Sequence, residues 1–334
     1  MSHNKHMGWG IMTLAFATAM VMGTALRAQE STTTAAKPEG EAKVQVVKPA
    51  LPTKAELPSY LQNISVTISA GFAQGSGTLY SRDGYSFVWT AGHVVDGLRR
   101  TREVIDPVSG TRRTLVEFDD AKILTELRED GRTVGRVEMD ARVLRFSDSN
   151  HGDDLAVLQV RKKDFVRATA VFYTDGKIPE IGTDVYHVGS LLGQLGSNSM
   201  TKGIVSQLGR VHENVVYDQT TATAFPGSSG GGVYLEDGRY VGMIVRGAGE
   251  GFNLMVPVRR MSTWAKSAKV EWAMDPNVPL PSQDELKKLP VEDVGAVFPG
   301  HTTQVKAQGN GTNEFKFWIR DIRPMEGSSS STGT

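Results

Sequence analysis

The stretch Ala224–Gly232 reads AFPGSSGGG and places two adjacent serines, Ser228 and Ser229, among glycines. Glycine loses more backbone freedom on folding than any other residue, so a run of it indicates positive φ angles or a close approach to the backbone. Segments rich in β-formers flank the run, Val215–Tyr217 before it and Gly232–Leu235 after it, which favours a loop between strands over a flexible linker. A tight turn with no further role could have the same sequence, so the function of this loop has to be inferred from the rest of the chain.

The β-rich character extends on both sides of this loop. Short runs of strand-forming residues alternate with turn residues, and few long helical patterns interrupt them. These runs are Ile64–Ile68, Gly77–Tyr80, Phe87–Thr90, Ala141–Phe146, Leu155–Val160, Asp184–Val188 and Tyr240–Val245. The pattern is typical of an all-β sandwich or a pair of barrels, and residues 58–262 would fit two packed barrels. One helix is expected from Val258 to about Lys269, because its apolar residues recur at helical spacing.

Composition excludes several kinds of site. Among 334 residues, 37 are Lys or Arg and 37 are Asp or Glu, so no net charge points to a nucleic-acid partner. The chain has no cysteine, which excludes disulfides, thiol nucleophiles and zinc–thiolate sites. His151, Asp153 and Asp154 resemble a ligand cluster, but no His-Glu-x-x-His pattern accompanies them. We therefore expect no metal and no cofactor.

The N-terminus has the pattern of an export signal. An uncharged run covers residues 7–26, and Arg27 and the small residue Ala28 follow it, so residues 1–28 are interpreted as a signal peptide or a membrane anchor. Residues 29–57 are rich in Thr, Ala, Lys, Pro and Glu and are expected to form a disordered linker. Residues 271–334 are expected to form a mostly irregular tail with one strand near Phe315–Ile319.

Three short elements carry residues suited to nucleophilic catalysis. His93 follows a strand that ends in small residues, which is a suitable place for a general base. Asp154 precedes a strongly apolar strand, where a buried acid needs a donor such as an imidazole N–H. Ser229 lies among glycines that allow the N–H groups of Gly227 and Ser229 to converge on an oxyanion. Taken singly, each element is also compatible with a purely structural role.

Together these elements resemble the chymotrypsin-like serine peptidases, whose catalytic residues follow the chain order His, Asp, Ser. The residues that carry the resemblance are Thr90–His93, Asp154–Leu158 and Gly227–Gly231, and Gly75–Leu79, Ile181–Val185, Thr201–Ser206 and Gly238–Gly242 look like the HtrA branch. The resemblance covers about residues 58–262. It implies two six-stranded antiparallel β-barrels with a short C-terminal helix. The peptidase domain would span 58–270, with barrel 1 at about 58–162 and barrel 2 at about 168–262.

The resemblance also implies the roles of individual residues. Ser229 would attack, His93 would move the proton, Asp154 would orient His93, and Gly227 and Ser229 would form the oxyanion hole. Thr223 would lie near the base of the substrate pocket, and Val245, Arg246 and Gly247 would pair with the substrate backbone. No acid falls at the pocket base, so we expect a small or medium apolar residue before the scissile bond.

Several features depart from the family pattern. Ser228 stands where trypsin-type enzymes carry an acid and HtrA types usually carry Asn. No PDZ domain is recognisable after the barrels, so substrate capture by such a domain is not expected.

The expected function is that of an exported serine endopeptidase, periplasmic or extracellular, that acts on protein or peptide substrates through an acyl-enzyme intermediate. The HtrA resemblance implies a role in envelope protein quality control and a homo-oligomer, commonly a trimer. Two alternatives remain open. The chain could be a catalytically silent binding protein on a peptidase fold, or an envelope scaffold anchored by residues 7–26.

Overall fold

The computed structural model of this chain describes residues 50–105, 107–108, 110, 112–129, 131–150, 152–166, 168–212, 215–247, 250–289, 291–292, 301–309 and 315–324. The chain divides into two units, Met1–Gln45 and Val46–Thr334, and every described residue belongs to the second unit. The predicted signal or anchor at 1–28 and residues 29–49 of the predicted linker lie outside the described residues.

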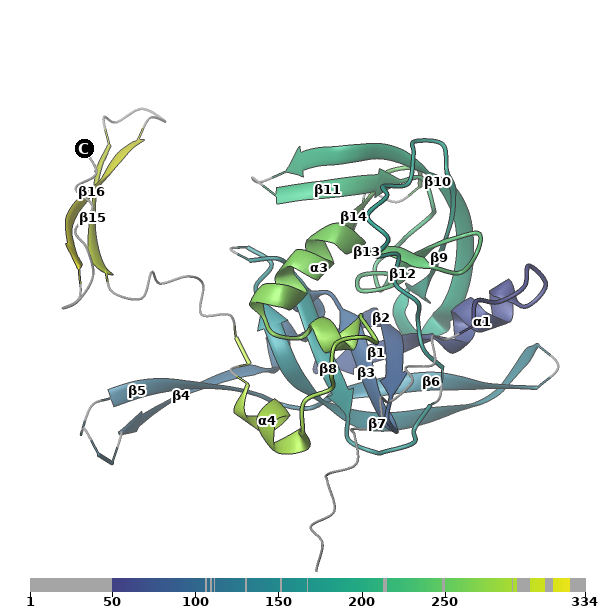
Figure 1. Cartoon of the computed structure of the whole chain (residues 1–334), viewed down its shortest axis with the longest axis horizontal. Helices are drawn as coiled ribbons and strands as arrows, with labels where there is room; N and C mark the ends of the chain where they lie inside the picture. Colours follow the sequence, from purple (N-terminus) through teal and green to yellow (C-terminus); the bar gives the residue numbers. More distant parts are fainter. Residues whose placement is uncertain are drawn as a thin grey trace, which may run out of the picture. The chain divides into compact units, whose positions relative to one another are not determined.

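The first half of the chain forms a closed antiparallel barrel, which we call barrel 1 (Figure 1). Its strands are β1 (Ser65–Ala70), β2 (Ala73–Arg82), β3 (Tyr85–Thr90), β6 (Ala121–Glu129), β7 (Arg132–Ser147) and β8 (Leu155–Val160), in the order β1-β2-β3-β8-β7-β6. Pairing of Ile68 with Ile123 joins β1 to β6 and closes the barrel. Strand β8 is buried along its whole length, as its continuous apolar sequence predicts.

The second half forms another closed antiparallel barrel, barrel 2. Its strands are β9 (Asp184–Leu191), β10 (Gly196–His212), β11 (Val215–Thr220), β12 (Gly232–Leu235), β13 (Tyr240–Gly247) and β14 (Asn253–Pro257), in the order β10-β11-β14-β13-β12-β9. The predicted fold class, all-β with two six-stranded antiparallel barrels, is therefore confirmed. The glycine-rich loop connects β11 to β12, between two strands as predicted.

The remaining described elements are short. They are α1 (Leu57–Asn63), α2 (Gly92–Val95), η1 (Asp96–Leu98), β4 (Arg99–Ile105), β5 (Arg112–Phe118), η2 (Gly193–Leu195), α3 (Val258–Ser267), η3 (Glu271–Ala273), α4 (Gln283–Lys288), β15 (His301–Gly309) and β16 (Phe315–Pro324). Helix α3 begins at Val258, where the apolar periodicity places it. Within the described part of the chain, none of these helices has the length and apolar character needed to cross a membrane.

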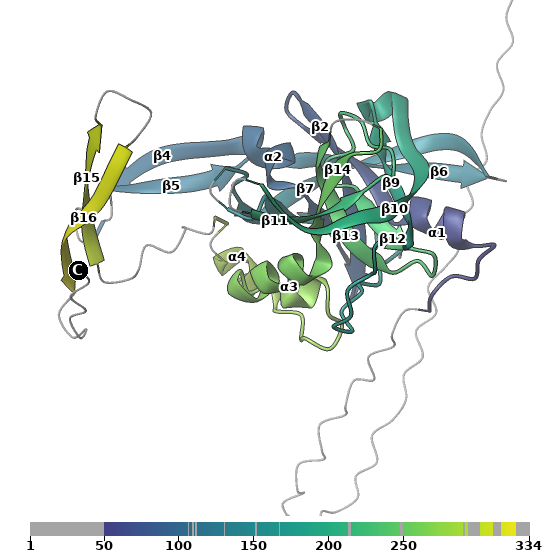
Figure 2. The same ribbon diagram turned by 90° about the horizontal axis from the view of Figure 1, so that it is seen from above.

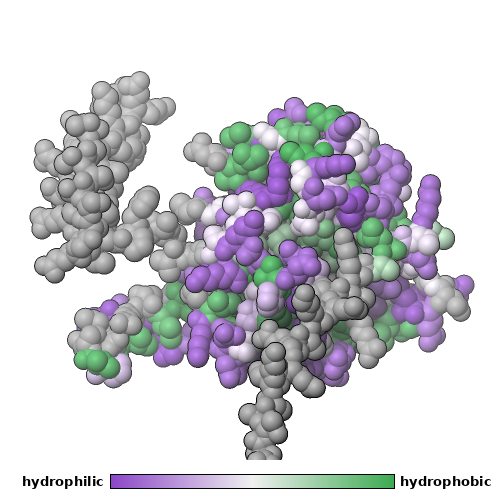
Figure 3. Space-filling model, viewed as in Figure 1, coloured by the Kyte–Doolittle hydropathy of each residue, from purple (hydrophilic) through white to green (hydrophobic). Residues whose placement is uncertain are grey.

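Aromatic side chains join the two barrels to α3. Trp89 of barrel 1 packs edge-on against Trp264 of α3, with ring centroids 5.7 Å apart, and donates its indole N–H to the carbonyl of Ala273 at 2.7 Å. Tyr234 of barrel 2 shares a hydrogen bond with Thr78 of barrel 1 at 3.1 Å. Figure 2 shows α3 beside the barrels from a second direction, and Figure 3 shows hydrophilic and hydrophobic residues interspersed over one face of the molecule.

Two regions differ from the sequence-based expectation. The arginine-rich segment 99–118 is not among the strand-forming runs expected from the sequence, but it forms the hairpin β4–β5, in which Arg100 pairs with Glu117 and Arg102 with Leu115. Its exposed, charged sequence hides the alternation that usually identifies a strand. In the tail, the expected strand is β16, but it pairs with a second strand, β15, whose polar sequence gives no strand signal. Helix α4 begins with a capping box between Ser282 and Glu285.

Candidate active site

His93 and Asp154 meet at one end of barrel 1. Strand β3 pairs with β8, with Thr90 opposite Ala156, so the residues that follow β3 lie beside those that precede β8. The Nδ1 atom of His93 lies 3.0 Å from each carboxylate oxygen of Asp154, and the backbone N–H of His93 donates to Oδ1 at 2.9 Å. The aspartate side chain is 2% exposed and the histidine side chain 36%. The carboxylate therefore fixes Nδ1 as the protonated nitrogen and leaves Nε2 available as a base.

The backbone before His93 has no room for a side chain. A β-carbon built at Gly92 would overlap the carbonyl oxygen of Ser147 and lie 3.3 Å from Oδ1 of Asp154. Gly92 thus allows the two segments to approach closely enough for the histidine–aspartate contact.

The glycine-rich loop gives its two serines different environments. Ser228 is 1% exposed, and its Oγ accepts a hydrogen bond from the N–H of Phe225 at 3.1 Å. Ser229 is partly exposed and lines a pocket. Ser228 therefore stabilises the loop from inside, and Ser229 presents its hydroxyl to the cleft. Within the described residues, neither Oγ of Ser229 nor Nε2 of His93 makes a hydrogen bond, so both are free to meet a substrate.

The amide groups of this loop are directed in two ways. The N–H groups of Ser228, Gly230 and Gly231 donate to backbone carbonyls within the protein at 2.7–2.9 Å. Those of Gly227 and Ser229 have no acceptor among the described residues. The carbonyl of Pro226 accepts a hydrogen bond from the N–H of Leu192. Because the C=O and N–H groups of a trans peptide point in opposite directions, the N–H of Gly227 points away from Leu192. An oxyanion hole needs amide N–H groups that no protein acceptor occupies, and the N–H groups of Gly227 and of Ser229 itself meet this condition.

Ser76 of β2 couples this loop to barrel 1. Its N–H donates to the carbonyl of Ser229 at 2.8 Å, and its Oγ donates to the carbonyl of Gly227 at 2.7 Å while accepting from the N–H of Ser190 at 2.7 Å. In the sequence, Ser76 stands out only as part of the stretch Gly75–Leu79, which looks like the HtrA branch. Its position between two glycines, Gly75 and Gly77, is the signal that a close backbone approach occurs here.

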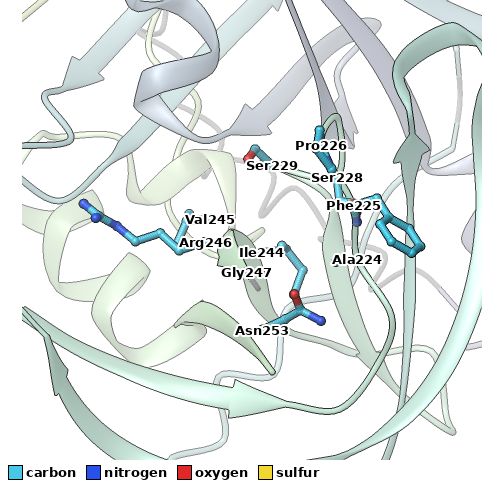
Figure 4. A pocket seen from close by; sticks show the side chains of 10 residues that line it. All are labelled: Ala224, Phe225, Pro226, Ser228, Ser229, Ile244, Val245, Arg246, Gly247 and Asn253. Carbon is cyan, nitrogen blue, oxygen red and sulfur yellow. Dashed lines mark hydrogen bonds between the residues drawn. The ribbon is translucent and has the colours of Figure 1, made fainter. Parts of the chain in front are cut away.

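A pocket of about 170 Å³ opens beside Ser229. Figure 4 shows Ala224–Pro226, Ser228 and Ser229 along one side, Ile244–Gly247 of β13 along the other, and Asn253 at the end away from Ser229. The predicted residues Val245, Arg246 and Gly247 line it. Thr223 is not among the residues that line it; its carbonyl accepts a hydrogen bond from Thr201 at 2.8 Å. Asn253, which sequence analysis missed, takes the place expected for Thr223 because β13 and β14 pair directly at Gly247 and Asn253.

A second histidine lies behind the glycine-rich loop. His187 of β9 is fully buried, and its Nδ1 contacts the carbonyl of Gly232 at 3.0 Å. Burial lowers the pKa of His187 to about 4, although the contact with Gly232 acts in the opposite direction. This imidazole is therefore neutral at neutral pH and packs against Gly189 and Gly231.

Asp153 and Asp154, two of the residues considered as metal ligands, make other contacts in the structure. Among the residues that the structure describes, no group of His, Asp and Glu is arranged to hold a metal ion. Asp153 instead contacts Arg260, and His151 lies outside the described residues. The structure thus pairs His93 with Asp154 and leaves the hydroxyl of Ser229 and the N–H groups of Gly227 and Ser229 without hydrogen-bond partners among the described residues, and it shows no hydrogen bond between Ser229 and His93.

Part of the chain is similar to known proteins. A family model for the trypsin-like peptidase domain matches residues 75–243, a range that contains His93, Asp154 and Ser229. Among solved structures, the crystal structure of Deg5 is 20% identical and superposes with a TM-score of 0.47; the match covers 66% of this chain and 95% of that one. No curated protein matches the sequence.

Proposed function

The chain belongs to the trypsin-like peptidase family, and on that premise we propose that it is an exported serine endopeptidase that hydrolyses peptide bonds in protein substrates. The catalytic residues would be Ser229, His93 and Asp154, with Gly227 and Ser229 as oxyanion donors. The peptidase domain would span residues 58–270, and residues 1–28 would direct export to the periplasm or the cell exterior.

One observation carries the catalytic part of the proposal. The histidine–aspartate pair is formed at 3.0 Å, while the amides of Gly227 and Ser229 stay without a protein acceptor in the described structure. Buried or half-buried N–H groups are rarely left unpaired in a purely structural loop, because each costs free energy when it loses water. The two free amides favour a catalytic loop over a silent binding module.

The chemistry follows from these positions. Oγ of Ser229 attacks the substrate carbonyl while Nε2 of His93 takes its proton, and Asp154 stabilises the resulting imidazolium. The negative oxygen is held by the N–H groups of Gly227 and Ser229. The imidazolium then gives its proton to the leaving amine as the C–N bond breaks, and water hydrolyses the acyl-enzyme by the same steps in reverse order.

The pocket supports a preference for small or medium apolar residues before the scissile bond. Among the described residues that line it, none is acidic, and one, the partly buried Arg246, carries a positive charge. A cationic Lys or Arg side chain would therefore find no counter-charge there. Profiling with a peptide library that returned a strong Lys or Arg preference would overturn this part of the proposal.

Labelling with a fluorophosphonate tests the proposal. The wild-type protein, Ser229→Ala and the matched control Ser228→Ala would be treated and examined by intact mass. One adduct is expected on the wild type and on Ser228→Ala, and none on Ser229→Ala. Absence of an adduct on the wild type, also in the presence of unfolded protein, would favour the silent binding protein. An adduct that persists in Ser229→Ala would contradict the assignment of the nucleophile.

A further inference from the structure

Arg260 links the C-terminal helix α3 to the loop that carries Asp154. Its Nε donates to Oδ1 of Asp153 at 2.9 Å, and its Nη2 donates to the backbone carbonyl of Asp153 at 2.7 Å. The guanidinium lies over the ring of Tyr217, 5.1 Å from its centroid, and the arginine side chain is 14% exposed. A residue 107 positions further along the chain thus holds the peptide group just before the acid of the candidate triad.

That peptide group is held on both sides. The carbonyl of Asp153 accepts from Arg260, and the N–H of Asp154, which belongs to the same peptide plane, donates to the carbonyl of Asp148 at 3.2 Å. Rotation of this plane is what would change φ of Asp154. The residue has φ +56°, a left-handed conformation that is unfavourable for a non-glycine residue. Both hydrogen bonds would be lost if the plane turned to reach a relaxed conformation.

We propose that Arg260 is a positioning residue for the peptidase reaction: by holding the carbonyl of Asp153, it keeps the carboxylate of Asp154 on Nδ1 of His93. The inference rests on the proposed function of the Ser229, His93 and Asp154 site. Arg260 does not touch the substrate and acts only through Asp154.

Arginine suits this task better than lysine. Its rigid fork reaches a carboxylate oxygen and a carbonyl oxygen at once, whereas an ammonium group is a single point charge on a flexible stem. The planar group can also stack on Tyr217. Arg260→Lys would therefore keep the charge and lose the fixed double contact.

Helix α3 provides a matched control. Arg259, the neighbouring residue, pairs with Asp218 inside barrel 2 through two hydrogen bonds of 2.6 Å and has no hydrogen bond with the described residues of the acid-bearing loop. Arg259→Ala removes a guanidinium from the same helix, and it should affect stability without affecting the alignment of His93. Asp153→Asn separates the two contacts of Arg260, because it removes the carboxylate and keeps the backbone carbonyl.

The test is the rate of fluorophosphonate labelling, measured on the protein expressed from its full sequence over a range of reagent concentrations. In Arg260→Ala we expect the maximal rate to fall about 10- to 100-fold, while the half-saturating concentration stays within about twofold because the pocket is intact. Arg260→Lys should fall by about tenfold, and Asp153→Asn and Arg259→Ala should stay within about twofold of wild type. A proton NMR signal from Nδ1 of His93, present in the wild type, should broaden or disappear in Arg260→Ala.

Each outcome decides between the ideas. A wild-type maximal rate and an unchanged Nδ1 signal in Arg260→Ala would overturn the positioning role and leave the proposed function intact. Equal losses in Arg260→Ala and Asp153→Asn would also overturn it, because the charge of Asp153 and not its carbonyl would be responsible. Absence of labelling in the wild type would overturn the proposed function and the inference with it. If Arg260→Ala does not fold, folded Arg260→Lys decides by the same criteria.

Discussion

The buried His187 should make the folded protein sensitive to mild acid. Its pKa is about 4 in the folded state against an ordinary value of 6.5, because burial disfavours the charged imidazolium. Between these two values the unfolded chain binds a proton that the folded chain does not. The free energy of unfolding therefore falls as the pH decreases from about 6.5 to about 4. At 1.36 kcal/mol per pH unit, the loss between about pH 7.5 and about pH 4.5 amounts to about 2.5 kcal/mol.

Urea unfolding at these two pH values measures the effect, and His187→Asn provides the comparison. The asparagine amide can still donate to the carbonyl of Gly232 but does not titrate. Carboxylates that titrate in the same range affect both proteins alike, so the difference between the two pH dependences isolates the histidine. Wild type should lose about 2.5 kcal/mol more than His187→Asn on acidification. Equal losses, within about 0.5 kcal/mol, would refute the reasoning, since His187 would then be protonated without cost.

Two further substitutions test the site and the packing of α3. Gly227 has φ +96°, and a methyl group added there by Gly227→Ala would overlap the carbonyl oxygen of Ser190. Displacement of this oxyanion donor should slow fluorophosphonate labelling by about 100-fold. Labelling at the wild-type rate would show that the loop accommodates a side chain. Trp89→Phe removes the buried indole N–H that donates to the carbonyl of Ala273. The unpaired carbonyl of Ala273 and the lost side-chain volume should lower the free energy of unfolding, measured by urea titration, by about 2–4 kcal/mol. A loss below about 1 kcal/mol would show that the contact is dispensable.

The barrels and the helix were accessible from sequence because their signals are local. Strand β8 is a continuous apolar run, and α3 has apolar residues at helical spacing, so a short window contains the information. The hairpin β4–β5 and strand β15 were missed because charged or polar residues dominate their sequences and leave few apolar positions to indicate a strand. Pairing with a neighbouring strand, which no local pattern records, determines their structure.

Some residues of the candidate site could be predicted from the sequence and others could not, for the same reason. His93, Asp154 and Ser229 stand beside small residues that leave a recognisable pattern in the sequence. Asn253 could not be found in that manner, because its place at the pocket depends on the register between β13 and β14. Arg260 depends on a contact between α3 and a loop of the other barrel, which only the folded chain reveals.

The distribution of the site along the chain bears on biosynthesis. His93 and Asp154 belong to the first half of the chain, Ser229 to the second, and Arg260 follows both barrels. A nascent chain that has completed only barrel 1 contains His93 and Asp154 but not Ser229. A chain that ends after barrel 2 lacks the hydrogen bonds from Arg260 of α3 to Asp153. Under the proposed function, a translation product that ends before the glycine-rich loop would lack the nucleophile and could not act as a peptidase, whereas one that ends before α3 would keep Ser229 and lose only the contact that positions Asp154.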